Sequence, residues 1–454
     1  MKTSVIGFPR VGTLRELKFA SEKYFRKEIT QDELLQVAKS LRKTHWETQK
    51  EAGMDYISSN DFSFYDMTLD TAVLLGIVPE RYRRLGLSPL DTYFAMARGY
   101  QGESGDVKAL AMKKWFNTNY HYIVPEVEDD MTIALSGDKL ITEYEEAKTL
   151  GIETKPVVIG PYTMLKLCRY TGDKKAVDFV DAFVNAYKQI VKTCEEHGAG
   201  WLQIEEPALV RDMDAPDIAL FDKIYDELLA SVSSCKVLLQ TYFGDVRDIY
   251  PQLISKPFAG IGLDFLEGKQ TYDLVEQYGF PADKILFAGL VNGKNIWKNH
   301  YENTLQVAAK LRQKGIQVVL STSCSLLHVP YTLQNETKLS KEYVDHFAFA
   351  VEKLTELKEL GELAECEDYT KETAYRNNHA LFEKDRNCSK QEVIERLAKV
   401  TEQDYIRLPK RSDRQKLQKE EFGLPELPTT TIGSFPQTKE VKANRAAYRK
   451  GEIT

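Results

Sequence analysis

The chain has 454 residues, of which 43% are hydrophobic, and a formal net charge of −7 at pH 7. This length suits roughly two or three ordinary domains or one large barrel, and the mild charge gives no reason to expect a nucleic-acid or membrane partner. The six cysteines are scattered without a CxxC pair, which favours a reducing, cytoplasmic setting over a disulfide framework. The apolar run at the start is too short for a signal peptide, and no segment approaches the length of a membrane span.

Short apolar runs closed by polar residues, glycine or proline predict eight strands along the chain. Helix-like stretches with apolar residues at three- and four-residue spacing separate most of them, as in residues 176–196, 217–232 and 303–314. Alternation of strand and helix predicts parallel strands, and eight such units predict an α/β fold, a (β/α)8 TIM barrel. The predicted strands are residues 4–8, 55–59, 156–159, 201–204, 237–242, 260–264, 285–288 and 318–321.

Two long segments do not fit a simple barrel. Residues 62–153 are too long for a loop and predict a partly helical insertion after the second strand. Residues 338–428 begin with one or two helices, continue with a charged stretch that has a short helix near 392–400, and predict a linker. The predicted domains are therefore a barrel over 1–337, a linker over 338–428 and a third segment over 429–454.

Active sites of such barrels lie where the strands end, so the paired carboxylates Glu205 and Glu206 after the fourth strand are candidates. Neighbouring residues on a strand face opposite sides, so only one of the two points into the barrel. Glu205 or Glu206 then serves as an acid, a base or an amine anchor. The alternative is an ion pair or a strand-end cap, and the spacing leaves both open.

Cys324 and His328 follow the eighth strand and raise the possibility of a thiolate–imidazole pair or a metal site. A spacing of four residues on an irregular strand end does not distinguish this pair from a buried, inert cysteine. The sequence contains no dinucleotide-binding GxGxxG, no P-loop and no HExxH in a strand–helix setting.

Basic residues form a third candidate group. Arg10 follows the first strand, and Arg15 and Lys18 are three residues apart, which places them on one face of the first predicted helix. Lys113 and Lys114 lie in the insertion and are candidates to join them. Such a cluster suits a ligand that carries several carboxylates or phosphates, whereas the alternative is a solvated helix face.

The end of the chain repeats its beginning. Residues 4–10 read Ser-Val-Ile-Gly-Phe-Pro-Arg, and residues 431–437 read Thr-Ile-Gly-Ser-Phe-Pro-Gln. Each copy runs through a basic, helix-like stretch to a matching end, at residues 24–30 and 448–454. A repeat at this separation indicates a duplicated domain. The second copy is too short to bury a core of its own, so we expect the truncated start of a second, homologous barrel.

Together these strings resemble cobalamin-independent methionine synthases, and the resemblance covers the whole chain. The strings that carry it are Ile6-Gly7-Phe8-Pro9-Arg10-Val11-Gly12, Arg15-Glu16-Leu17-Lys18, Lys114-Trp115-Phe116-Asn117-Thr118-Asn119-Tyr120-His121-Tyr122, Gln203-Ile204-Glu205-Glu206-Pro207-Ala208-Leu209 and Thr430-Thr431-Ile432-Gly433-Ser434-Phe435-Pro436-Gln437. The resemblance implies two face-to-face barrels of common origin. It also implies methyl transfer from 5-methyltetrahydropteroyltri-L-glutamate to L-homocysteine, giving L-methionine.

The resemblance also implies roles for particular residues. Arg15, Glu16, Leu17, Lys18 and Lys114 match the stretches that contact the glutamate tail of the folate, which favours binding over a solvated face for the basic cluster. The family's homocysteine-contacting stretch is matched by Ile432, Gly433 and Ser434.

The resemblance implies zinc, and no cobalamin, for the full-length family. The zinc ligands are a His-x-Cys pair, a Glu and a further Cys in the second barrel, and this chain stops before them. In the first barrel, residues 241–243 contain neither His nor Cys, and only Asp264 and Cys324 stand near the duplicated ligand positions. Two ligands are too few for a zinc site. We therefore expect no metal site and no catalytic residue in this chain.

Three hypotheses follow. In the first, the chain is the folate-tail-binding half of the methyltransferase, inactive without the C-terminal barrel that is its partner. In the second, it is a non-catalytic module that binds folate polyglutamates. In the third, it is a stand-alone barrel enzyme that uses Glu205, Asp264 or Cys324 on an unknown substrate.

Overall fold

The computed structural model describes residues 1–383, 390–431 and 433–454. The chain divides into two compact units, Met1–Lys384 and Asp385–Thr454, which are described separately.

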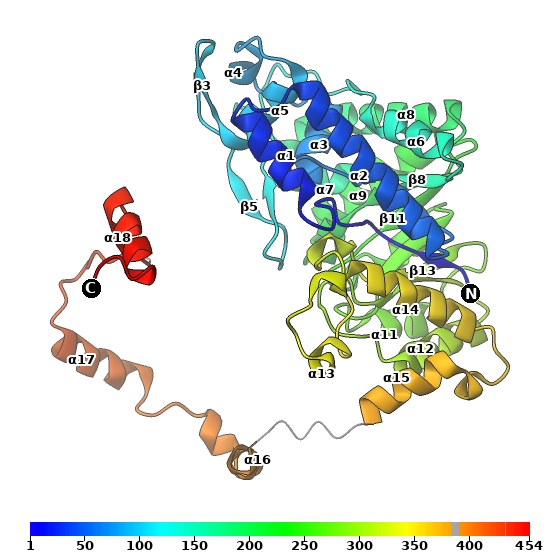
Figure 1. Cartoon of the computed structure of the whole chain (residues 1–454). Helices are drawn as coiled ribbons and strands as arrows, with labels where there is room; N and C mark the ends of the chain where they lie inside the picture. The colour runs from blue at the N-terminus through cyan, green and yellow to red at the C-terminus, as the bar shows by residue number, and fades with distance from the viewer. Residues whose placement is uncertain (384–389, 432) are drawn as a thin grey trace. The chain divides into compact units, whose positions relative to one another are not determined.

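A closed barrel of eight parallel strands forms the centre of the first unit (Figure 1). The hydrogen-bonded order is β1-β14-β13-β12-β11-β10-β8-β2, and a parallel bridge between Ser4 and Tyr56 joins β1 to the edge formed by β2. The fold predicted from the alternating pattern is therefore confirmed. The strands are β1 Thr3–Ser4, β2 Ile57–Ser59, β8 Thr154–Ile159, β10 Trp201–Glu205, β11 Lys236–Gln240, β12 Gly260–Asp264, β13 Ile285–Val291 and β14 Gln317–Thr322.

All eight predicted strands are present, because strands covered on both faces carry apolar runs that are easy to recognise. The prediction for β12 has the observed bounds, whereas β1 is shorter than predicted. The backbone N–H of Ile6 donates to the hydroxyl of Thr322, and that of Phe8 donates to the carboxylate of Asp61. These side-chain acceptors replace the strand partners, so the ladder ends at Ser4.

Helices surround the barrel, and their buried faces match the predicted apolar spacing. After β14 come the short helix α13, Lys341–Val344, and then α14, Ala350–Leu363, which packs against β1, β13 and β14. The predicted domain boundary at residue 337 thus falls inside the first unit. The other surrounding helices are α2 Gln31–Glu51, α6 Lys139–Thr149, α8 Val180–Glu196, α9 Ala215–Leu229, α10 Tyr250–Ser255, α11 Thr271–Tyr278, α12 Tyr301–Gln313 and α15 Thr373–Glu383.

The insertion after β2 is partly helical, and it ends before the predicted residue 153. It contains strand pairs as well as helices, and α6, which was included in it, is the barrel helix that packs on β2 and β8. A separate hydrophobic cluster joins the insertion to α1, Glu16–Phe25, through Ala20, Phe94 and Ile123. The insertion elements are α3 Met67–Leu74, α4 Glu80–Arg83, α5 Pro89–Arg98, β3 Tyr100–Gly102, β4 Gly105–Val107, β5 Met112–Lys114, β6 His121–Ile123 and β7 Glu126–Val127.

The second unit contains helices with no buried residue: α16 Gln391–Ala398, α17 Arg411–Phe422 and α18 Lys439–Arg449. The helix expected in the second copy of the repeat is α18, which begins after the capping residue Thr438. Its expected strand does not form in the described residues 429–431 and 433–437, since a strand needs a hydrogen-bonded neighbour. Across the described parts of both units, no helix has the length and apolar character required to cross a membrane.

Candidate functional site

The first basic group lies at the start of α1. Leu17 is buried against a small apolar cluster that includes Phe62, and this contact fixes the orientation of the helix start. Glu16 accepts a hydrogen bond from the backbone N–H of Leu14 at 3.0 Å. Arg15 precedes the helix with φ of 66°, is exposed, and has no ion-pair partner among the described residues. Lys18 is 53% exposed and lies 3.8 Å from Glu22, so both cations remain available to a ligand.

Lys114 is exposed at the end of β5, which pairs with β6 in an antiparallel hairpin. Its ammonium group lies 3.5 Å from the side-chain oxygen of Asn119, a long contact that leaves most of its hydrogen-bonding capacity unused. The next residue, Trp115, is buried and makes edge contacts with Phe116 and Tyr122. The backbone that carries Lys114 is thus anchored while its side chain is free.

The start of α1 and the hairpin attach to the same part of the insertion. Arg10, in the loop before α1, donates to the carbonyl of Ser63 at 2.8 Å, and Tyr120 in the hairpin donates to the carbonyl of Tyr65 at 3.0 Å. Arg10 therefore differs in role from Arg15 and Lys18. Arg10 holds the insertion in place, whereas the other two are exposed.

The paired carboxylates after β10 face opposite sides, as the strand geometry predicts. Glu205 points into the barrel, where Gln203 and Tyr242 donate to its two oxygens at 2.8 and 2.7 Å. Lys155 completes this interior network by donating to Gln203 and to the carbonyl of Val5. Burial raises the pKa of Glu205 to about 7 and lowers the pKa of Lys155 to about 8.

Glu206 points outward and caps α7, Pro161–Leu167. It accepts the backbone N–H groups of Tyr162 and Thr163 at 2.9 and 2.7 Å and the hydroxyl of Tyr225 at 2.5 Å. Burial raises its pKa to about 7. A Cβ atom at Gly160 would lie 2.2 Å from its carboxylate, which explains the glycine there. Glu206 is therefore a cap at the end of its strand, which was the alternative to an acid, a base or an amine anchor.

The other candidates in the barrel are also engaged. Asp264 accepts the backbone N–H groups of Phe243, Leu266 and Glu267 at 2.8–3.0 Å, so its carboxylate closes a turn. His328 contacts the ring of Phe243 with centroids 5.4 Å apart, and burial lowers the pKa of its imidazole to about 4.

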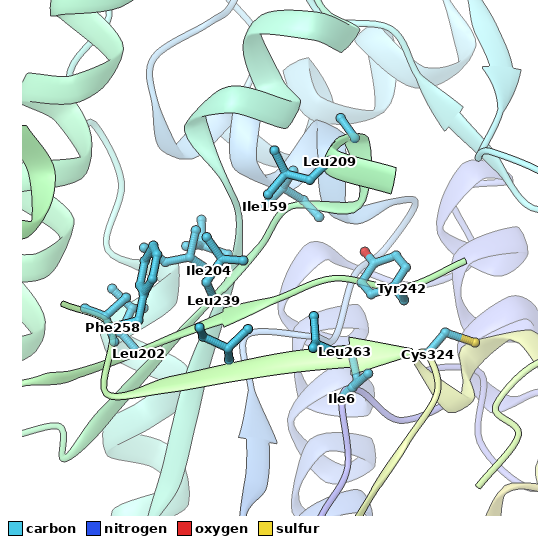
Figure 2. Packing of buried hydrophobic residues seen from close by; sticks show 14 of the residues in the cluster. Ile6, Ile159, Leu202, Ile204, Leu209, Leu239, Tyr242, Phe258, Leu263 and Cys324 are labelled. Carbon is cyan, nitrogen blue, oxygen red and sulfur yellow. The ribbon is translucent and has the colours of Figure 1, made fainter. Parts of the chain in front are cut away.

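Cys324 lies among buried hydrophobic side chains that include Ile6, Tyr242 and Leu263 (Figure 2). Burial raises the pKa of its thiol well above the usual range, which disfavours the thiolate that nucleophilic or metal chemistry requires. No group of three or more His, Cys, Asp or Glu residues suited to a metal occurs in the described ranges. Asp264 already accepts three N–H groups, and two protein donors are too few for a zinc site, so these residues do not fit a zinc ion.

The tip of the β5–β6 hairpin lies against the loops that follow four successive strands. Phe116 contacts Phe243 after β11, Asn117 bonds Glu267 after β12 and Lys294 after β13, and Tyr120 contacts His328 after β14. A cavity of about 430 Å³ remains between them. It is lined by Asn117, Thr118, Asn119, Tyr120, Lys294, Leu327 and His328.

Sequence reasoning did not single out the contact of Asn117 with Glu267 and Lys294. These residues are 150 and 177 positions from Asn117 along the chain, so no local spacing could reveal the contact. Glu267 and Lys294 each follow a predicted strand, so the signal that could have joined them is the barrel geometry, which brings the carboxyl ends of the strands together.

The fold and the site define a (β/α)8 barrel protein with engaged carboxylates inside and free cations on its inserted elements and first helix. A family profile described as the N-terminal domain of cobalamin-independent synthase matches residues 2–315, and one described as the catalytic domain of that synthase matches residues 427–454. The chain therefore belongs to the cobalamin-independent methionine synthase family.

Curated relatives agree with this assignment. The chain is 53% identical over its whole length to a 5-methyltetrahydropteroyltriglutamate–homocysteine methyltransferase of Streptococcus thermophilus, and 52% identical to one of Lactococcus lactis. It spans 60% and 59% of the length of these two proteins.

Two solved structures share the fold. They are a putative vitamin-B12-independent methionine synthase of Listeria monocytogenes, with a TM-score of 0.55 and 15% identity, and a B12-independent methionine synthase of Shewanella, with 0.52 and 14%. The alignments cover 80% and 79% of this chain and 98% and 97% of those chains. At this identity the likeness concerns the fold alone.

Proposed function

We propose that the chain supplies the folate-tail-binding half of a cytoplasmic, cobalamin-independent methyltransferase. The reaction moves a methyl group from 5-methyltetrahydropteroyltri-L-glutamate to L-homocysteine, giving L-methionine and tetrahydropteroyltri-L-glutamate. The observation that carries this proposal is the 53% identity, across the entire chain, to a relative named for that reaction. The scattered cysteines support the reducing compartment.

The exposed cations support the assignment of tail binding to this half. A triglutamate tail presents several carboxylates, which bind well to the forked guanidinium of Arg15 and to the point charges of Lys18 and Lys114. Arg15 and Lys114 are exposed, and neither forms an ion pair with a described residue. Leu17 and Glu16 serve this site by fixing the helix start rather than by adding positive charge.

The homocysteine half of the reaction belongs, in this proposal, to the remainder of the full-length protein. Zinc bound there would lower the pKa of the homocysteine thiol. The donors of this barrel do not fit zinc, so we assign no metal step to this chain. Gly433 and Ser434 are exposed in the second unit, and Ile432 lies outside the described residues. Their contact with homocysteine stays a prediction that needs the second barrel.

The second candidate is a folate-polyglutamate-binding module without a catalytic role. The engaged state of Glu205, Asp264 and Cys324 favours it over a stand-alone barrel enzyme, since each of these groups is buried and already serves the fold. The two tail-binding candidates differ in whether the chain works with a second barrel.

An activity assay with the purified chain tests the proposal. Incubation with labelled 5-methyltetrahydropteroyltri-L-glutamate and homocysteine should give no methionine, and metal analysis should give no stoichiometric zinc. Addition of the separately produced C-terminal barrel should restore methionine formation if the first candidate holds, and should leave none under the second. Methionine made by this chain alone together with bound zinc would contradict both.

A further inference from the structure

Three side chains from distant parts of the chain meet at the hairpin tip. The ammonium group of Lys294 lies 2.8 Å from both carboxylate oxygens of Glu267 and 2.9 Å from the side-chain oxygen of Asn117. Asn117 in turn donates its amide N–H to Glu267 at 2.9 Å. Lys294 and Glu267 have side chains only 24% and 27% exposed, so this ion pair is more shielded than an ordinary surface pair.

Aromatic contacts beside this cluster hold the same tip. Phe116 in the hairpin and Phe243 after β11 lie with ring centroids 6.0 Å apart, and Lys294 lies 5.2 Å from the centroid of Phe243. Both phenylalanines have positive φ, 48° and 74°. A bulky residue rarely adopts this conformation unless its surroundings impose it, and such positions gather at functional sites.

The other end of the hairpin is fixed independently. The backbone N–H of Ile123 donates to Asp66 at 3.0 Å, and that of Val124 donates to the carbonyl of Ala111 at 2.8 Å. Lys114 lies between these bonds at the base and the cluster at the tip. Its backbone position therefore depends on both ends of the hairpin.

We propose that Asn117, Glu267 and Lys294 form a clasp that holds the hairpin tip against the barrel mouth and positions Lys114 for the carboxylates of the glutamate tail. The clasp is a positioning device, because its own charges are paired with each other. Holding the strand in its binding geometry before the ligand arrives removes the ordering cost from the binding step. This inference rests on the proposed tail-binding function.

Asparagine suits the central position of the clasp because its amide offers one acceptor and one donor. The oxygen faces the lysine and the nitrogen faces the glutamate. If the two charges exchanged places, a half-turn of the amide would satisfy both again. This property allows a charge-swap experiment.

The test measures two quantities on the whole chain: hydrogen exchange of the backbone amides of residues 112–123, and affinity for the mono- and triglutamate forms of methyltetrahydrofolate. The variants are Glu267→Gln, Lys294→Met and the double swap Glu267→Lys with Lys294→Glu. Lys223→Met is the matched control, since it breaks the 2.7 Å ion pair with Asp181 on the surface of the barrel helices. Thermal unfolding checks that each variant folds.

Each single variant should speed exchange in the hairpin and weaken triglutamate binding by about three- to tenfold, with little change for the monoglutamate. The double swap should restore most of the protection from exchange and most of the triglutamate affinity. Lys223→Met should change neither the exchange nor the affinity. The two single variants alter the net charge in opposite directions. A long-range charge effect would therefore strengthen binding in Glu267→Gln and weaken it in Lys294→Met, and this result would overturn the clasp.

Two further outcomes would also overturn the inference. Faster hairpin exchange without a change in triglutamate affinity would show that the clasp does not position Lys114, and unchanged exchange would show that there is no clasp. If the unaltered chain binds both folates equally, the proposed function fails and the positioning role fails with it. The exchange data still decide whether the clasp holds the hairpin.

Discussion

Charged residues at the ends of the barrel strands and those at the start of α1 and in the insertion behave in opposite ways. Glu205, Glu206 and Asp264 are buried, and each accepts two or three hydrogen bonds from the protein. Arg15 and Lys114 are exposed and keep most of their bonding capacity free. At the strand ends where a barrel enzyme holds its catalytic groups, this chain therefore has structural carboxylates, and its free charges lie where a polyanion can reach them.

This difference also separates two kinds of experiment. Substitutions of the buried carboxylates should change stability with little direct effect on ligand binding to the folded chain. Substitutions of the exposed cations should weaken ligand binding with little effect on stability. The predictions below run from the largest expected effect to the smallest.

Glu206→Ala should give the largest loss of stability. It leaves the N–H groups of Tyr162 and Thr163 and the hydroxyl of Tyr225 buried without acceptors. The expected loss is about 3 kcal/mol in the free energy of unfolding, measured by urea denaturation. The exposed Glu196→Ala, also on a barrel element, should cost no more than about 0.5 kcal/mol. Equal losses in the free energy of unfolding for the two variants would contradict the structural role of Glu206.

Glu205→Gln should change how stability depends on pH. Burial raises the pKa of Glu205 from 4.5 to about 7, so between these values the folded chain keeps a proton that the unfolded chain has lost. The free energy of unfolding contributed by this group therefore falls as pH rises through that window, by about 1–3 kcal/mol. The stability of the wild type relative to Glu205→Gln should fall accordingly from pH 5 to 8. Parallel profiles would show that the carboxyl group titrates normally.

Lys114→Ala should weaken triglutamate binding by about tenfold, equivalent to about 1.4 kcal/mol, with stability almost unchanged. The reason is the loss of one charge-assisted bond at an exposed position. Lys23→Ala, on the same helix α1 as Lys18, is the control and should have little effect in calorimetry. A similar loss in both variants would indicate attraction by general positive charge rather than a site.

Alkylation of the folded chain should leave Cys324 unmodified, because the residue is 1% exposed and its thiol pKa is raised. Cys366 is half-buried and should react before Cys324. Peptide mapping by mass spectrometry separates the two, and also Cys388, which lies outside the described residues. Rapid labelling of Cys324 would revive the stand-alone enzyme hypothesis.

The barrel was predictable because its strands are apolar and its helices keep a regular spacing. The opposite orientation of Glu205 and Glu206 followed from strand geometry alone. Lys18 is exposed on α1 as expected, whereas Arg15 is exposed but precedes the helix with φ of 66° instead of lying on its face. The reading of Arg10 as part of the same group missed its bond to Ser63. These features depend on interactions between residues that are close in the chain, so the sequence is enough to predict them.

Other features depend on tertiary contacts that sequence spacing does not record. The end of the first unit lies beyond residue 337 because α14 packs on strands at both ends of the barrel sequence. The clasp joins residues 27 to 177 positions apart. The insertion contains short strands, of two or three residues each, whose pairing supplies a stability that such brief sequences do not signal.

Calorimetry with the mono- and triglutamate forms of methyltetrahydrofolate, at low and high salt, tests the central claim most directly. If Arg15, Lys18 and Lys114 hold the tail, the triglutamate should bind at least about tenfold more tightly, and this advantage should shrink as ionic strength rises from about 0.05 to 0.5 M. Equal affinities for the two forms, unchanged by salt, would contradict a charge-based tail site in this chain.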